Sequence, residues 1–228
     1  MRPENMRRNP LICDSMLSCT MLCGGCLARL AGCPAATFDQ GSSLMHCEIR
    51  DASDGDLPAI ARLHATSWKV AYRGILPDAF LDHDLEGNRA QRWAGIFDRM
   101  APRDRVLIAM LERSPAGFIS GWTTAAMDCE PGFDLHVDNL HVRPDLRGQG
   151  LGVALMQSLS KRQTPDGSVR AYLWVLDGNE AAYRFYVRLG GRVSDQRQIE
   201  FGGAMVGETR IVWDDFRSLS LWPRCDSQ

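Results

Sequence analysis

A glycine-rich segment in the second half of the chain has the composition of an anion-binding turn. It reads Val-Arg-Pro-Asp-Leu-Arg-Gly-Gln-Gly-Leu-Gly over residues 142–152, and it passes from an apolar run into a helical pattern. Glycine lets a backbone come close to a ligand, and the N–H groups and dipole at the start of a helix favour an anion such as pyrophosphate. Arg147 adds a cation. The segment predicts a phosphate cradle, while a glycine-rich turn that binds nothing remains the alternative.

Two other phosphate-binding motifs do not fit this segment. A Rossmann turn belongs to the first βαβ unit and has an acidic residue about 20 residues further on. Here several strands are expected before the turn, and the stretch Tyr172–Leu176 is apolar. A P-loop is excluded because no Gly-Lys-Ser/Thr sequence follows.

Acid–base chemistry could come from three polar residues in the apolar run before the turn. Asp134, His136 and Asp138 alternate along an expected strand, so their side chains should project from one face. Any of them could accept a proton directly or through a water molecule. A solvated strand face would show the same alternation, and both interpretations stay open.

The elements that must position these residues follow from the hydrophobic period. Strands are expected at about 47–52, 106–111, 117–125, 135–142, 169–176, 193–201 and 204–213, and helices at about 57–70, 88–100, 150–162 and 179–189. A turn at 113–117 should join the second and third strands as an antiparallel hairpin, and Asn179 should cap the last helix. The order predicts a mixed α+β fold with a central sheet flanked by helices.

The composition favours one globular domain with appendages. The chain has 228 residues, of which 45% are hydrophobic and 24% charged, and its net charge of -2 gives no sign of a nucleic-acid or membrane partner. No apolar run reaches the roughly 18 to 20 residues of a membrane-spanning helix. We therefore expect a soluble, cytoplasmic protein.

Five of the eight cysteines lie in a leader of about 45 residues without a clear period, and they are Cys13, Cys19, Cys23, Cys26 and Cys33. Cys23-Gly-Gly-Cys26 could be half of a metal or redox site. Leu30–Cys33 resembles a lipobox, although Asp14 and Arg29 would interrupt its apolar region. The favoured interpretation is a disordered leader, or a start placed too early, with the working protein beginning near Met45.

The expected organisation is thus a cysteine-rich leader over 1–45, one domain over 46–216 and a tail over 217–228. The other three cysteines are scattered through the body of the chain, which makes a disulfide framework there improbable. No metal site is expected in the domain.

Two motifs resemble those of the GNAT N-acetyltransferases. Arg147-x-x-Gly150-x-Gly152 resembles the family's acetyl-CoA signature, Arg/Gln-x-x-Gly-x-Gly/Ala, and the preceding residues 139–144 look like its fourth strand. Residues 179–190 are similar to its second block, Asn-x-x-Ala-x-x-Phe-Tyr-x-x-x-Gly, and residues 49–77 to a common bacterial opening. The resemblance covers about Met45 to Trp213. It implies the GNAT-type acyl-CoA N-acyltransferase fold, with a mixed, mostly antiparallel sheet.

The resemblance also implies an activity. Such an enzyme moves the acetyl group of acetyl-CoA to a primary amine by direct attack in a ternary complex, as a monomer or homodimer. The acceptor would be a small-molecule amine or a protein or peptide amine. A non-catalytic module that senses acyl-CoA is the alternative from another functional class.

The family's residue roles transfer to matching positions of this sequence. Tyr186 would be the general acid for the leaving thiolate, and Trp68, Tyr72 and Arg73 would lie on the acceptor side. Many relatives have a glutamate where His136 stands, so an imidazole, with an ordinary pKa near 6.5, could replace a carboxylate base, with Asp138 as the other candidate. The implied cofactor-binding residues are Leu140, His141, Val142, Arg147, Gly148, Gln149, Gly150, Leu151, Gly152 and Asn179.

Overall fold

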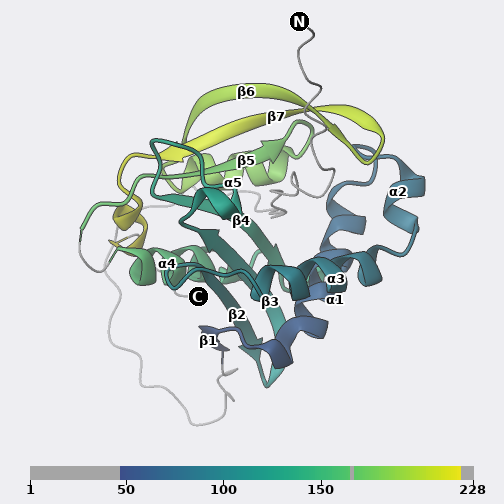
Figure 1. Cartoon of the computed structure of the whole chain (residues 1–228), viewed down its shortest axis with the longest axis horizontal. Helices are drawn as coiled ribbons and strands as arrows, with labels where there is room; N and C mark the ends of the chain where they lie inside the picture. Colours follow the sequence, from purple (N-terminus) through teal and green to yellow (C-terminus); the bar gives the residue numbers. More distant parts are fainter. Residues whose placement is uncertain (1–46, 165–166, 222–228) are drawn as a thin grey trace, which may run out of the picture.

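A computed structural model describes residues 47–164 and 167–221, and its centre is one seven-stranded sheet (Figure 1). In spatial order the strands are β1 (Cys47–Asp51), β2 (Arg105–Leu111), β3 (Ser114–Trp122), β4 (Leu135–Val142), β5 (Ala171–Leu176), β7 (Ala204–Trp213) and β6 (Arg192–Phe201). Neighbours are antiparallel except β4 and β5, which are parallel. The expected mixed, mostly antiparallel sheet is confirmed.

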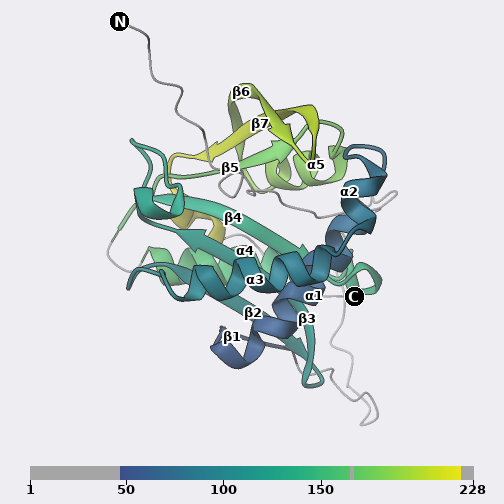
Figure 2. The same ribbon diagram turned by 45° about the vertical axis from the view of Figure 1, so that its right-hand side comes forward.

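Helices cover both faces of the sheet because its strands are apolar on both sides. The helices are α1 (Leu57–Ala71), α2 (Asp78–Asp82), α3 (Leu85–Phe97), α4 (Leu151–Gln163) and α5 (Glu180–Arg188). In β2, Val106 and Ile108 pack with α1 and α3, whereas Leu107 and Ala109 belong to the cluster that contains α4 and α5. Figure 2 shows α3 lying across α1 on their shared face. The sheet therefore separates two helical layers.

A β-bulge interrupts β4 in its middle. Ser120 of β3 is opposite Asn139, but the next residue, Gly121, is opposite Val137, so Asp138 is the extra residue. Because of this bulge, Leu135 and Val137 before it and Leu140 and Val142 after it all pack in the cluster with α4 and α5.

The parallel pairing of β4 with β5 is short. In the described part of the chain it consists of Leu135 with Ala171 and His136 with Tyr172, and beyond these pairs the two strands separate. The rest of β4, up to Val142, therefore runs along a gap in the sheet.

Three local expectations were wrong. The hairpin between β2 and β3 turns at Glu112 and Arg113, whose φ angles are 48° and 66°, so Ser114 to Gly117 belong to the strand and not to a turn. The strand ends at Trp122. Helix α3 begins before Asn88, because the Asp84 side chain accepts a hydrogen bond from Gly87 N at 3.1 Å. The short helix α2 was not expected at all.

The interpretations of the leader, including those at Cys23–Cys26 and Cys33, lie outside the described residues. Within 47–164 and 167–221, no helix is long and apolar enough to cross a membrane. Within the same ranges, no cluster of three or more His, Cys, Asp or Glu side chains is arranged to hold a metal ion.

Candidate active site

The glycine turn between β4 and α4 depends on two left-handed backbone positions. Gly148 and Gly150 have φ angles of 81° and 79°, which residues with a side chain rarely adopt. No heavy atom lies within 4 Å of where a Cβ would stand at either residue. Glycine is thus required here by the backbone conformation and not by crowding.

Gly150 also determines how α4 begins. As the N-cap it has no side chain, and within the described chain no side chain caps this helix. Helix α5 differs, since the Asn179 side chain accepts a hydrogen bond from Ala182 N at 3.3 Å. The first N–H groups of an α-helix have no acceptor inside the helix. The start of α4 therefore offers N–H donors and a positive dipole end to an anion.

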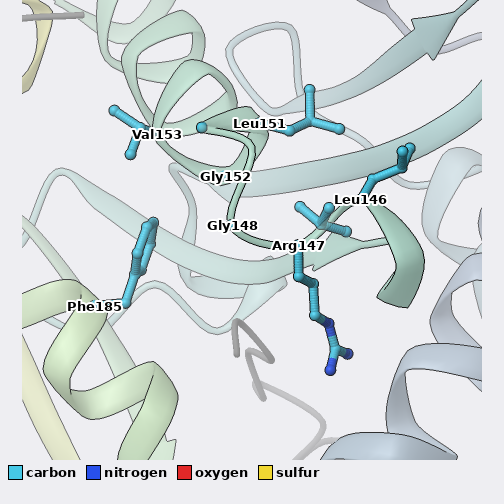
Figure 3. A pocket seen from close by; sticks show the side chains of 9 residues that line it. Leu146, Arg147, Gly148, Leu151, Gly152, Val153 and Phe185 are labelled. Atoms are coloured by element: carbon cyan, nitrogen blue, oxygen red, sulfur yellow. The ribbon is translucent and has the colours of Figure 1, made fainter. Parts of the chain in front are cut away.

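A pocket opens at this turn (Figure 3). It joins the end of β4, the turn, the start of α4 and one side chain of α5. Its lining consists of Val142, Leu146, Arg147, Gly148, Gly150, Leu151, Gly152, Val153 and Phe185. Six of these were expected to bind the cofactor, whereas Leu146, Val153 and Phe185 were missed. Phe185 and Tyr186 are consecutive residues of one helix, and the sequence does not show which of the two side chains faces the turn.

The Arg147 side chain does not lie over the turn. Figure 3 shows it pointing away from the glycines, and its Nη2 donates a hydrogen bond to Ser67 Oγ of α1 at 3.3 Å. In this structure the turn therefore offers backbone N–H groups to a ligand, and the guanidinium lies on the α1 side.

Tyr186 and Asn179 belong to α5 and its cap, as the pocket residue Phe185 belongs to α5, but they do not line the pocket. The Tyr186 ring is fully buried, edge-on to Trp213 with the ring centroids 6.1 Å apart, and next to Phe185. Asn179 is 7% exposed and caps α5. Both therefore have structural roles, which are compatible with a role toward the cofactor.

The candidates for a general base differ in their surroundings. Asp134 Oδ2 accepts a hydrogen bond from Arg170 N at 2.8 Å, which joins the starts of β4 and β5. His136 is 2% exposed, and neither ring nitrogen has a hydrogen-bond partner among the described residues. Burial, with smaller contributions from Arg197 and Arg92, lowers the pKa of His136 to about 3. The ordinary basicity expected for this imidazole does not apply here.

Asp138 at the bulge is 3% exposed and held by neighbours. Asn139 Nδ2 donates to Asp138 Oδ2 at 2.5 Å, and Arg92 Nη2 of α3 lies 4.0 Å from the same oxygen. His141, two residues beyond Asn139, stacks on His64 of α1, with the ring centroids 4.6 Å apart. The polar side chains of β4 thus face α1 and α3, on the opposite side of the sheet from Leu140 and Val142.

The expected acceptor side forms an aromatic wall. Trp68 and Tyr72 are fully buried, and Trp68 lies 5.5 Å from the Phe201 ring at the end of β6 and under the Arg89 guanidinium, 4.6 Å from its carbon. Arg73 has another role, because it forms ion pairs with Asp78 and Asp82 at 2.9 and 2.7 Å and so holds α2.

Comparisons with known proteins agree on one family. The model of the acetyltransferase (GNAT) family matches residues 62–191, which is more than half of the chain. The L-methionine sulfoximine/L-methionine sulfone acetyltransferase of Pseudomonas aeruginosa is 29% identical over 184 residues, covering 78% of this chain and 97% of that protein. The uncharacterised N-acetyltransferase YuaI of Bacillus subtilis is 23% identical over 172 residues, covering 75% and 95%.

Solved structures of other N-acetyltransferases have a similar fold. The PaiA N-acetyltransferase of Thermoplasma acidophilum, in complex with coenzyme A, superposes with a TM-score of 0.58 at 22% identity, covering 72% of this chain and 98% of that one. This likeness concerns the arrangement of the sheet and its helices.

Proposed function

The chain belongs to the GNAT acetyltransferase family, and from this premise we propose that it transfers the acetyl group of acetyl-CoA to the amine of a small molecule by direct attack in a ternary complex. As a member of that family it is an acetyl-CoA-dependent N-acetyltransferase. The identity of the acceptor and the ternary mechanism belong to the proposal.

The observation that carries the proposal is the uncapped start of α4 beside the pocket. Gly148 and Gly150 shape the turn, and Phe185 closes the pocket opposite it. N–H donors converging beside an apolar wall fit a pyrophosphate followed by a pantetheine chain. The residues present therefore suit coenzyme A, and the thioester, once bound, supplies the activated acetyl group. We assign the pyrophosphate to the residues 147–152.

The gap between β4 and β5 supports a position for the acyl carbonyl. After His136 and Tyr172 the two strands no longer pair, so those peptide groups of Leu140 to Val142 that are turned away from β3 face the gap instead of β5. Backbone N–H groups in such a place can stabilise the negative charge that develops on the carbonyl oxygen. We assign this role to the backbone of β4.

Tyr186 is proposed as the proton donor to the leaving thiolate. Its position in the second motif supports this role, and so does its place directly after Phe185 of the pocket wall. His136 and Asp138 remain predicted candidates for the base, and both side chains lie on the side of α1 and α3.

A small-molecule acceptor is proposed because of the relatives. The Pseudomonas aeruginosa protein acts, by its name, on L-methionine sulfoximine and L-methionine sulfone, and the match covers almost its whole length. A protein or peptide amine is the other acceptor that the family resemblance implies.

The test measures thiol release from acetyl-CoA with three kinds of amine: L-methionine sulfoximine, spermidine and a peptide with an unblocked N-terminus. We expect turnover of one of the small amines, and its loss in Gly150→Glu, whose carboxylate would repel the pyrophosphate. Gly203→Glu is the matched control, since Gly203 has a φ of 82° and open space around it but lies in the β6–β7 turn.

Calorimetry with coenzyme A separates the outcomes. Binding without turnover of any amine would point to an acyl-CoA-sensing module instead of an enzyme. No binding at all by the folded chain would overturn the proposal.

A further inference from the structure

Glu208 is a buried carboxylate that no role described so far uses. It lies in β7, opposite Leu176 at the end of β5 on one side and opposite Arg197 of β6 on the other. Its exposed fraction is 0%. A charged side chain is rarely buried to this extent unless its partners or its function require it.

The hydrogen bonding of Glu208 is one-sided. Arg197 Nε donates to Oε1, whereas Oε2 has no hydrogen-bond partner among the described residues. A buried carboxylate oxygen without a donor is unfavourable in a folded protein. Glu208 Oε2 can therefore accept a hydrogen bond from a donor group of a ligand.

Glu208 lies on the sheet face opposite the glycine turn. Register partners share a face, so Glu208 lies on the side of Leu176, and its neighbour Arg210 on the side of Trp174. Leu176 packs with Trp68 of α1, on the expected acceptor side. Phe185 of the pocket belongs instead to the cluster on the other face.

These positions put the glycine turn and Glu208 on opposite faces of the sheet. The pocket lies at the end of β4 on the face of α4 and α5, whereas Glu208 lies in β7, on the other side of β5 from the gap, on the face of α1 and α3. Leu176, its register partner, is also the last residue of β5, and Asn179 N, at the start of α5, donates to Leu176 O at 3.0 Å. An amine that approaches the end of β5 from the α1 side would meet this carboxylate beside Leu176.

We propose that Glu208 binds the ammonium group of the acceptor and takes up one of its protons before acetyl transfer, an assignment that rests on the function proposed above. The carboxylate and the ammonium become a carboxylic acid and a neutral amine. The amine lone pair then forms the C–N bond as the C–S bond breaks. Tyr186 gives its proton to the thiolate, the second proton of the nitrogen replaces the one that Tyr186 has lost, and Glu208 returns its own proton to solvent.

The surroundings suit Glu208 to this task better than the residues of β4. Burial raises the pKa of Glu208, Arg197 of β6 lowers it, and Glu130 and Asp177 raise it. The net shift is upward, which makes the carboxylate a stronger base than usual. The neutral His136, with its pKa of about 3, is a weaker base, and Asp138 is already held by Asn139.

The first experiment compares Glu208→Gln with Glu200→Gln, an exposed glutamate of the same hairpin. With the amine that wild type acetylates best, kcat/KM should fall roughly 100-fold or more in Glu208→Gln, the usual scale of acid–base catalysis, and stay unchanged in Glu200→Gln. Affinity for coenzyme A, measured by calorimetry, should be equal in both variants. Equal turnover by wild type and Glu208→Gln would overturn the assignment and leave the proposed function standing.

The second experiment measures how kcat/KM depends on pH. A purely structural role of Glu208 would not shift this profile in a predicted direction. The base must be deprotonated, so kcat/KM of wild type should fall as pH decreases through the pKa of Glu208. Arg197→Gln removes a stabilising cation, and this acid limb should move to higher pH. If the acid limb of Arg197→Gln stayed at the wild-type pH, the proposal would be contradicted. This test does not need the Glu208→Gln variant, so it also holds if that variant does not fold. Absence of turnover in wild type would instead overturn the proposed function, and this assignment with it.

Discussion

The imidazole ring of His136 lies parallel to the phenol ring of Tyr172, with 4.6 Å between the ring centroids and 5° between the planes. The same two residues form the last pair that joins β4 to β5 in the described chain. Tyr172 is held in turn by the loop before β4, because its hydroxyl donates to Asp128 O at 2.7 Å and accepts from Glu130 N at 3.0 Å. This stack therefore marks the point where the sheet opens.

Tyr172→Phe should lower the free energy of unfolding by about 1–3 kcal/mol, because it removes two hydrogen bonds from a mostly buried hydroxyl. Tyr183→Phe of α5, whose side chain is only partly buried, is the control and should change stability by less than about 0.5 kcal/mol. Urea unfolding at neutral pH measures both values. Equal stability of Tyr172→Phe and wild type would show that the loop does not depend on this hydroxyl.

The protein should lose stability in mild acid because of its buried histidines. Burial lowers the pKa of His136 and of His141 to about 3, below the roughly 6.5 of an unfolded chain. As pH falls from 6.5 toward 3, the unfolded state binds protons that the folded state does not. Each of the two residues should therefore cost about 1.4 kcal/mol of stability per pH unit in this window, and nothing above it.

The measurement is the free energy of unfolding at pH 7, 6 and 5 for two histidine variants. His141→Gln should flatten the pH dependence by the contribution of one proton, whereas His83→Gln, at an exposed position, should leave it as in wild type. Identical slopes in the two variants would contradict the buried, neutral state of His141.

Gly191→Ala should destabilise the fold by about 1–3 kcal/mol through overpacking. A Cβ there would overlap Ile211 Cγ2 and lie 2.9 Å from both Trp213 Cζ2 and Tyr186 O. Gly95→Ala is the matched control, since no atom lies within 4 Å of its Cβ and the residue is inside α3, where alanine is the better helix former. Thermal unfolding should show a lower Tm for Gly191→Ala alone.

Gly150→Ala should weaken the binding of coenzyme A, whereas the matched substitution Gly203→Ala should not. An alanine disfavours the left-handed conformation by about 1–2 kcal/mol and so moves the N–H groups at the start of α4. Gly203→Ala carries the same backbone penalty at a φ of 82° but lies far along the chain from the turn. Calorimetry should show about a tenfold lower affinity in Gly150→Ala only. Equal affinities would contradict the placement of the pyrophosphate.

Tyr186→Phe should reduce kcat by roughly 100-fold or more if the hydroxyl protonates the thiolate, with little change in affinity for coenzyme A. Its neighbour on α5, Tyr183→Phe, should retain the wild-type rate. A single-turnover assay with saturating acetyl-CoA measures the chemical step. A wild-type rate in Tyr186→Phe would remove this residue from the mechanism.

Those features that depend on consecutive residues could be predicted from the sequence. The turn at Gly148 and Gly150 was recognisable because only glycine readily takes these φ angles, and the cap at Asn179 because a short polar side chain reaches the backbone two or three residues on. The order of strands and helices followed from the hydrophobic period, and it was sufficient for the fold class. These effects are local, because they depend only on residues that are close together in the sequence.

The tertiary structure decided what depends on neighbours distant in the sequence. The bulge at Asp138 arises from the register with β3, and the end of pairing at His136 from the position of β5. No pattern in the sequence showed that Phe185 would face the pocket, or that Glu208 would be fully buried in β7. The basicity of a side chain also depends on its desolvation and on nearby charges, and both exist only after strands and helices have packed together.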